Sequence, residues 1–206
     1  MKDVGSRREH KKTELRQRII QDAMTLFRQH GFAETSMESI AATAGITKRT
    51  LYKYFPVKEA IVSGFWMQNV QQQSQLLPQL LAQFPDTRSR LVAVFLSAAE
   101  GFMKEPAFAR IHFSYQFQLL GKSANPQFGN DFDQFLTAVI NTGQAEGDIR
   151  NDMADSELAA QLMFNFTAVC LIWFADTRAF SLEQRLKNTV DCFMDGAAKT
   201  KKTKRG

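Results

Sequence analysis

The sequence predicts an all-α protein with a small N-terminal domain of three helices and a larger helical C-terminal domain. Apolar residues recur every three or four positions through most of the 206 residues, which is the spacing of one helix face. Charge divides the chain in the same way: residues 1–58 carry 12 Lys or Arg against 6 Asp or Glu, and residues 59–198 carry 9 against 15. We therefore expect domains at 1–56 and 57–198, followed by a basic, disordered tail at 199–206.

The first predicted helix covers residues 14–30. Its apolar residues share one face: Leu15, Ile19, Ala23, Leu26 and Phe27. Gly31 follows at a position where a helix end favours a left-handed residue. The basic run "SRREHKK" precedes this helix, and we expect it to form an N-terminal arm.

Two short helices are predicted next, on either side of Gly45. Thr35 or Ser36 can cap the first, over "MESIAATA", because each offers a hydroxyl oxygen to the free amides of the first turn. Thr47 can cap the second, which ends before Pro56. Two short helices joined at a glycine are typical of a helix-turn-helix.

The second short helix separates its side chains into two faces. Leu51 and Phe55 lie four positions apart and point inward. Basic, hydroxyl and phenol groups, which suit DNA phosphates and base edges, fall on the opposite arc: Lys48, Arg49, Tyr52 and Lys53. From this pattern alone, a packed pair of helices with a solvated basic face remains the alternative.

The run "TSMESIAATAGITKRTLYKYFPVKEAI", preceded by "RIIQDAMTLFRQHGFAE", resembles the DNA-binding domain of the tetracycline-repressor (TetR) family of bacterial transcription regulators. The resemblance covers about residues 14–62. It implies phosphate contacts from Thr35 or Ser36, Tyr52 and Lys58, and groove contacts from Thr47, Lys48, Arg49, Thr50 and Lys53. Tyr54 stands where many relatives carry His, so it either contacts phosphate or packs. Because Lys53 and Arg49 replace commoner residues, the operator sequence cannot be taken from any relative.

The rest of the chain predicts further helices. One begins near Val57 and Lys58 and runs toward Pro78, which would link the two domains. Others are expected at about 87–104, 107–120, 130–146, 155–175 and 181–197, with breaks marked by proline, glycine and capping residues.

The last two predicted helices indicate a homodimer. Residues 155–175 are apolar on nearly all sides, and residues 181–197 carry one apolar stripe. A helix that is apolar on nearly all sides in a small domain suggests a partner subunit, and TetR relatives dimerise through these helices. We therefore expect a four-helix bundle made of the two helices from each chain. The predicted interface residues are Phe166, Trp173, Leu182, Leu186, Val190 and Phe193.

A ligand pocket is expected among the helices between residues 87 and 175. Its predicted walls are Phe102, Ile111, Tyr115, Phe135 and Phe166, with His112, Gln116 and Asn165 as polar groups. Polar residues of this kind are more often ordinary core or surface groups than ligand contacts. The 18 Phe and 8 Met residues favour an apolar effector, with an aromatic or acyl-chain part.

These observations predict a ligand-responsive regulator, in this family usually a repressor, that binds a palindromic operator in double-stranded DNA as a homodimer. The alternative is an architectural or protein-recruiting DNA-binding factor with the same fold and no small-molecule inducer. The histidines lie in unrelated segments, and no metal-ligand spacing, nucleophile elbow or glycine-rich phosphate loop occurs, so we expect no enzyme, metal or cofactor. The polar opening residues and the interrupted apolar stretches predict a cytoplasmic protein that does not bind a membrane.

Overall fold

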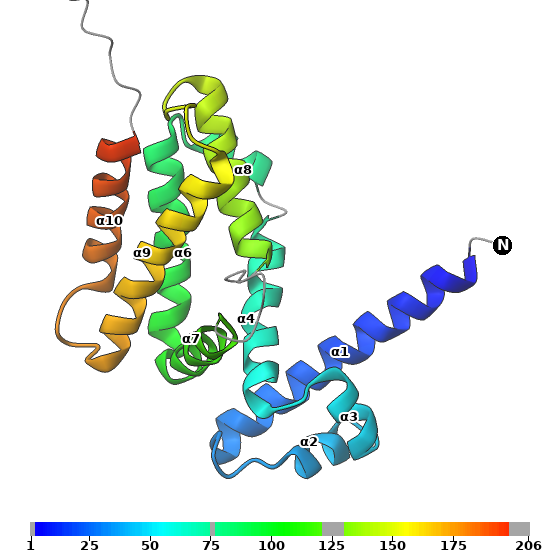
Figure 1. Ribbon diagram of the computed structural model, residues 1–206. Helices are drawn as coiled ribbons and strands as arrows, with labels where there is room; N and C mark the ends of the chain where they lie inside the picture. The colour runs from blue at the N-terminus through cyan, green and yellow to red at the C-terminus, as the bar shows by residue number, and fades with distance from the viewer. Residues whose placement is uncertain (1–2, 75–76, 121–129, 198–206) are drawn as a thin grey trace, which may run out of the picture. The chain divides into compact units, whose positions relative to one another are not determined.

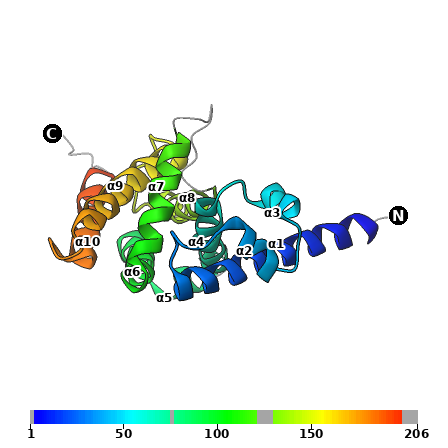
Figure 2. The ribbon, with the colours of Figure 1, turned by 90° about the horizontal axis from the view of Figure 1, so that it is seen from below.

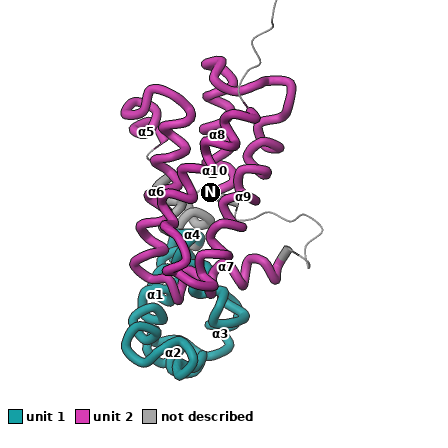
Figure 3. The backbone as a smooth tube through the Cα atoms, turned by 90° about the vertical axis from the view of Figure 1, so that its left-hand side faces the viewer, with its two compact units in different colours: residues 1–68 teal, residues 69–206 magenta. Residues whose placement is uncertain are grey.

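The computed structural model describes residues 3–74, 77–120 and 130–197, over which the chain forms ten helices and no strand (Figure 1). The predicted all-α fold is confirmed. The backbone divides into two compact units, Met1–Gln68 and Asn69–Gly206 (Figure 3), and the division falls within the helix α4. The predicted tail at 199–206 lies outside the described residues.

Unit 1 contains α1 (Asp3–His30), α2 (Met37–Thr43), α3 (Lys48–Tyr54) and the first part of α4 (Lys58–Ser74). The two short helices lie on one side of α1 (Figure 1), and both pack through the same core. As predicted, Gly31 directly follows α1 and Gly45 lies just after α2. Both have a positive φ, +89° and +64°, which glycine adopts more readily than other residues.

The helix α1 is longer than the sequence pattern indicates. It begins at Asp3, so the expected arm "SRREHKK" is helical. Arg, Glu and Lys have good helix propensity, and the Thr13 hydroxyl donates to the Glu9 carbonyl (3.1 Å). No apolar periodicity marks this stretch, which is why the prediction placed the helix start near Glu14.

The core of unit 1 forms where α1, α2, α3 and α4 meet. Its fully buried side chains include Ile20, Phe27, Ile40, Leu51, Phe55 and Ile61. Leu51 and Phe55 point inward as predicted, with exposed fractions of 0% and 1%. Burial of these two side chains anchors α3 to the unit and leaves its other face to solvent.

Unit 2 contains α5 (Leu77–Gln83), α6 (Thr87–Lys104), α7 (Pro106–Leu120), α8 (Asn130–Glu146), α9 (Asp155–Ala175) and α10 (Leu182–Ala197). The last five begin and end within one residue of the predicted ranges. The helix α5 was not predicted, because Pro78 suggested an end to the preceding helix. Proline is also tolerated in the first turn of a helix, and Pro78 is the second residue of α5.

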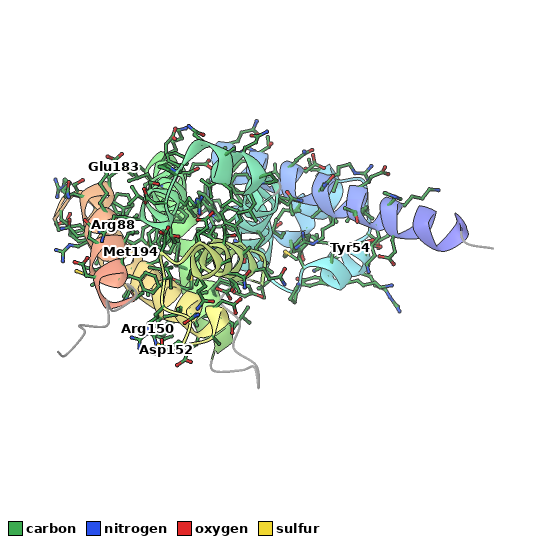
Figure 4. All side chains as sticks on the ribbon, turned by 90° about the horizontal axis from the view of Figure 1, so that it is seen from above. Tyr54, Arg88, Arg150, Asp152, Glu183 and Met194 are labelled. Carbon is green, nitrogen blue, oxygen red and sulfur yellow. The ribbon has the colours of Figure 1, made fainter. Side chains whose placement is uncertain are left out.

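In unit 2, α8 and α10 each pack against both α6 and α9 (Figure 1). The helix α7 also packs against α6 and α9, and the view from below shows it along its length (Figure 2). An ion pair joins α6 to α10, because the Arg88 guanidinium contacts the carboxylates of Asp191 and Asp195. Arg88 lies beside α10, whose Met194 is also labelled in Figure 4.

The helix α9 is apolar enough by length and composition to span a membrane, with a mean hydropathy of 1.8. Half of this apolar stretch of α9 is buried inside the protein. Core helices of soluble proteins can be equally long and apolar, so α9 alone does not indicate a membrane span.

A polar cluster joins the start of α6 to the end of α8; we refer to Thr87, Arg90, Gly143, Glu146 and Asp148 as the α6–α8 junction. Asp148 accepts hydrogen bonds from the Thr87 amide (2.9 Å) and hydroxyl (3.0 Å). Buried Arg90 donates to both carboxylate oxygens of Glu146 (2.5 and 3.2 Å). A Cβ atom placed on Gly143 would lie 2.2 Å from Thr87 Oγ1, so the two helices meet here without room for a side chain.

Candidate nucleic-acid interface

The start of α2 is fixed by Ser36. Its hydroxyl accepts a hydrogen bond from the Ser39 amide (3.0 Å), and the Ser39 hydroxyl accepts one from the Ser36 amide (3.2 Å). This reciprocal pair is a capping box with serine at both positions. Ser36 itself is exposed, so its side chain is open to a ligand.

Thr35 does not cap α2. Its side chain is buried, with an exposed fraction of 3%, and its hydroxyl donates to the Gly31 carbonyl (2.8 Å). Of the two predicted phosphate contacts at this position, only Ser36 is therefore available on the surface.

The helix α3 carries most of the predicted groove contacts. Thr47 caps it, because its hydroxyl accepts from the Thr50 amide (3.1 Å). Arg49, Tyr52 and Lys53 are exposed, and Tyr54, labelled on α3 in Figure 4, is half-buried. Because Leu51 is buried beneath them, these side chains form one outward basic and aromatic surface, the α3 surface, which consists of Thr47, Lys48, Arg49, Thr50, Tyr52 and Lys53.

Lys48 is paired within the protein. Its ammonium group, at the start of α3, contacts the Glu38 carboxylate in the first turn of α2. This hydrogen bond lowers the pKa of Glu38 and raises the pKa of Lys48. Both side chains are more than half exposed (54% and 56%), so the carboxylate can be exchanged for a DNA phosphate. Sequence reasoning missed this pair, because a turn separates its members.

Lys58 has partners that the sequence did not suggest. Its Nζ donates to the backbone carbonyls of Phe32 (2.7 Å), Ala33 (3.1 Å) and Thr35 (2.8 Å). It also lies 4.7 Å from the centroid of the Phe32 ring. A phosphate contact from Lys58 would replace at least one of these hydrogen bonds.

The α3 surface has the chemistry of DNA recognition. Ammonium and guanidinium groups bind phosphates, an arginine fork can reach guanine, and hydroxyl and phenol groups donate to backbone oxygens. In the described parts of the chain, no three His, Cys, Asp or Glu side chains are grouped so as to hold a metal ion.

The predicted effector residues lie in unit 2, and two of them, Phe102 and Phe166, meet in an aromatic cluster. Phe166 of α9 lies 6.0 Å from Phe102 of α6 and 6.3 Å from Phe113 of α7, measured between ring centroids. Phe132 and Phe174 extend the cluster, at 5.6 Å from Phe166 and 5.5 Å from Phe113. Sequence reasoning missed Phe113, Phe132 and Phe174, although all three belong to the same apolar runs.

The remaining predicted effector residues are at or near the interior. Phe135 of α8 is buried, and the α7 residues are half-buried: Ile111, His112, Tyr115 and Gln116. Desolvation lowers the pKa of the His112 imidazole to about 4, so this side chain is neutral at pH 7. A neutral imidazole can donate one hydrogen bond and accept another.

Asn165 is not brought together with these residues. It is exposed and lines a groove of about 590 Å³ between α9 and α10, on the other side of α9 from Phe166. The groove is also lined by Ile172 and Phe193. Asn165 therefore lies outside the aromatic cluster.

The predicted dimer residues are mostly covered within one chain. Phe166, Trp173, Leu182, Leu186 and Val190 have exposed fractions of at most 5%. In contrast, Phe164 and Ile172 of α9 are 61% and 63% exposed, and Phe193 is half-buried in the groove. The accessible apolar side chains of α9 and α10 thus include Phe164, Ile172 and Phe193, whereas the predicted stripe is buried within the chain.

The helix-turn-helix domain matches a known protein family. Residues 19–64, which include α2, α3 and the start of α4, match the family model described as "Bacterial regulatory proteins, tetR family". The chain is 24% identical over 189 residues to the HTH-type transcriptional repressor KstR2 of Rhodococcus jostii, covering 89% of this chain and 91% of the repressor.

Two solved structures have the same fold. The TetR-family repressor FadR of Thermus thermophilus, in complex with lauroyl-CoA, superposes with a TM-score of 0.75 at 24% identity, over 93% of this chain and 99% of FadR. A transcriptional regulator of Saccharomonospora viridis, in complex with choline, gives a TM-score of 0.56 at 23% identity, over 91% and 100% of the two chains. The helix-turn-helix domain, over residues 19–64, is thus that of the TetR-family regulators, and the chain as a whole shares their fold.

Proposed function

We propose that the protein is a ligand-responsive repressor that binds a palindromic operator as a homodimer and is released by an apolar effector. The observation that carries this proposal is the α3 surface, where exposed basic, hydroxyl and phenol groups stand over the buried Leu51. A helix held in this way can enter the major groove as a unit. The proposal implies a cytoplasmic location, where the operator DNA is found.

Dimerisation is proposed through α9 and α10. Phe164 and Ile172 are large apolar side chains that are more than 60% exposed, and the groove beside Ile172 can accept side chains of a second copy. A two-fold dimer would place two α3 helices in successive major grooves, about 34 Å or somewhat more apart. We thus expect an operator with two inverted half-sites.

The proposed effector site is the aromatic cluster of unit 2 and its surroundings: Phe102, Ile111, His112, Phe113, Tyr115, Gln116, Phe132, Phe135, Phe166 and Phe174. The packed phenylalanine rings favour an apolar guest, and His112, whose ring lies 5.3 Å from the Phe113 ring, is a polar group beside them. FadR of Thermus thermophilus binds a fatty acyl-CoA in the same fold, which supports an acyl chain as the apolar part. A coupling of about 1–3 kcal/mol, transmitted along α4, would weaken operator binding 5–150-fold.

We expect Lys53→Ala to weaken binding of the selected operator by about 1–3 kcal/mol. The substitution removes one exposed positive charge from α3, so the slope of log affinity against log salt should fall in magnitude by about 0.9. The measurement is DNA selection with the purified protein, followed by salt titrations of the best site. Lys104→Ala is the matched control, since Lys104 is exposed on α6 and should leave affinity and slope unchanged.

The same selection separates the proposal from its alternative. A short inverted repeat bound by a dimer supports a local regulator. Uniform, salt-sensitive binding with no preferred sequence would refute operator recognition and favour an architectural factor with the same fold.

For the effector, we expect long-chain acyl-CoA to raise the melting temperature of the protein and to release it from the operator. Free coenzyme A is the control, because it lacks the apolar chain that the aromatic cluster would bury. A shift that grows with acyl-chain length supports the proposed site. Thermal shifts with small polar ligands or metal ions alone would contradict it. Choline, which the Saccharomonospora viridis regulator binds, is included among the small polar ligands.

A further inference from the structure

We infer that Lys58 is a positioning residue for DNA binding: it holds the corner of residues 31–35 and thereby sets the start of α2, rather than touching phosphate itself. This inference rests on the proposed function. It departs from the phosphate role that the family resemblance implies, and the reason lies in the partners of the ammonium group.

An ammonium group has three N–H donors, and the structure supplies three acceptors. The carbonyls of Phe32, Ala33 and Thr35 lie 2.7, 3.1 and 2.8 Å from Lys58 Nζ. All three come from one four-residue stretch, so the backbone of the corner turns its carbonyls toward a single cation. Hydrogen bonds to a charged donor are stronger than neutral ones, which makes Lys58 the main link between this stretch and α4.

Other contacts fix the same corner from the side of α1. The Thr35 hydroxyl donates to the Gly31 carbonyl (2.8 Å), and the Phe32 ring lies 5.0 Å from the Phe27 ring. The Phe32 ring also lies 4.7 Å from Lys58 Nζ, so one aromatic side chain contacts both the core and the cation. The corner is therefore held between α1 and the first residue of α4.

The last of the three carbonyls belongs to Thr35, and the next residue is the N-cap Ser36. The direction in which the chain enters α2 thus depends on where Lys58 holds the Thr35 carbonyl. Because Lys58 is the first residue of α4, a rotation of that turn would move the corner and the capping serine together. Lys58 therefore links two elements. One is α4, the helix expected to transmit the effector signal, and the other is Ser36, the proposed phosphate contact.

The salt dependence of operator binding distinguishes a positioning residue from a phosphate ligand. We expect Lys58→Met, in the full chain, to weaken operator binding about 5- to 30-fold without changing the salt slope. Loss of a direct phosphate contact would instead lower the slope by about 0.9 and overturn the inference. Lys58→Arg should not restore wild-type affinity, because a planar guanidinium cannot direct three donors at these carbonyls.

A double-mutant cycle tests the connection to α2. Ser36→Ala should weaken binding in the wild-type background and have little further effect beside Lys58→Met, since the serine is already misplaced there. Additive losses would overturn the inference. Thr35→Val loosens the same corner without a change of charge, so it should reproduce the loss of affinity at constant slope.

A measurement on the wild-type protein does not depend on whether the variants fold. Reductive methylation with labelled formaldehyde should modify Lys58 more slowly than exposed Lys53, with no DNA present, because the Lys58 ammonium is held by three carbonyls. Equal rates would overturn the inference. This outcome is independent of operator binding, so it separates a failure of the inference from a failure of the proposed function.

Discussion

Replacing Leu51 with alanine is expected to destabilise unit 1 by about 2–5 kcal/mol and to abolish operator binding near physiological temperature. Leu51 has an exposed fraction of 0% and lies under the α3 surface, so its truncation leaves a cavity in the core. A unit of this size buries a modest core and has only a few kcal/mol of stability to lose. Denaturant unfolding of the variant, followed by a binding titration, measures both effects.

The adjacent residue provides the control for Leu51→Ala. Tyr52 lies on the same helix but is 44% exposed, so Tyr52→Ala should change stability by no more than about 0.5 kcal/mol while weakening DNA binding. Equal destabilisation by the two variants would show that the inward and outward faces of α3 are assigned incorrectly.

Gly143→Ala is expected to destabilise unit 2 by a net of about 2–5 kcal/mol. The added Cβ would lie 2.2 Å from Thr87 Oγ1, and Thr87 cannot move away without breaking its two hydrogen bonds to Asp148. Overpacking and the loss of these bonds outweigh the gain of about 1 kcal/mol in helix propensity. The change in unfolding free energy is measured by thermal or denaturant unfolding.

Gly196 offers a matched control within a helix of the same unit. A Cβ at this position in α10 would meet no described atom within 4 Å. Gly196→Ala should therefore be neutral or stabilising by up to about 1 kcal/mol. Destabilisation of similar size at Gly143 and Gly196 would contradict the close approach at the α6–α8 junction.

The sequence predicted helices well where apolar runs stand between proline, glycine or capping residues. The helices from α6 to α10 match their predicted ranges because those signals are local. The start of α1 lacks apolar periodicity, and α5 contains no buried residue, so neither was recognised.

The outward residues of α3 were predictable because the signal is again local. Once Leu51 and Phe55 point inward, helix geometry determines which side chains point outward. The partners of Lys58 and Thr35 were not, because they are backbone carbonyls, which every residue carries. Asn165 and Phe166 show a different limit. The helix α9 is apolar on nearly every side, so its sequence does not indicate which of two adjacent residues faces the interior.

The ion pair between Glu38 and Lys48 has a consequence for the choice between operator and bulk genomic DNA. While Lys48 is paired with the Glu38 carboxylate, the α3 surface presents one positive charge fewer to DNA of random sequence. Fewer counterions are then released in such encounters, and the protein dissociates from them sooner. Under the proposed function, a well-placed operator phosphate would replace the carboxylate, and Lys48 would then contribute its full charge. The ion pair would thus raise the ratio of operator binding to non-specific DNA binding. This ratio sets how many copies of the protein a cell needs to occupy one operator.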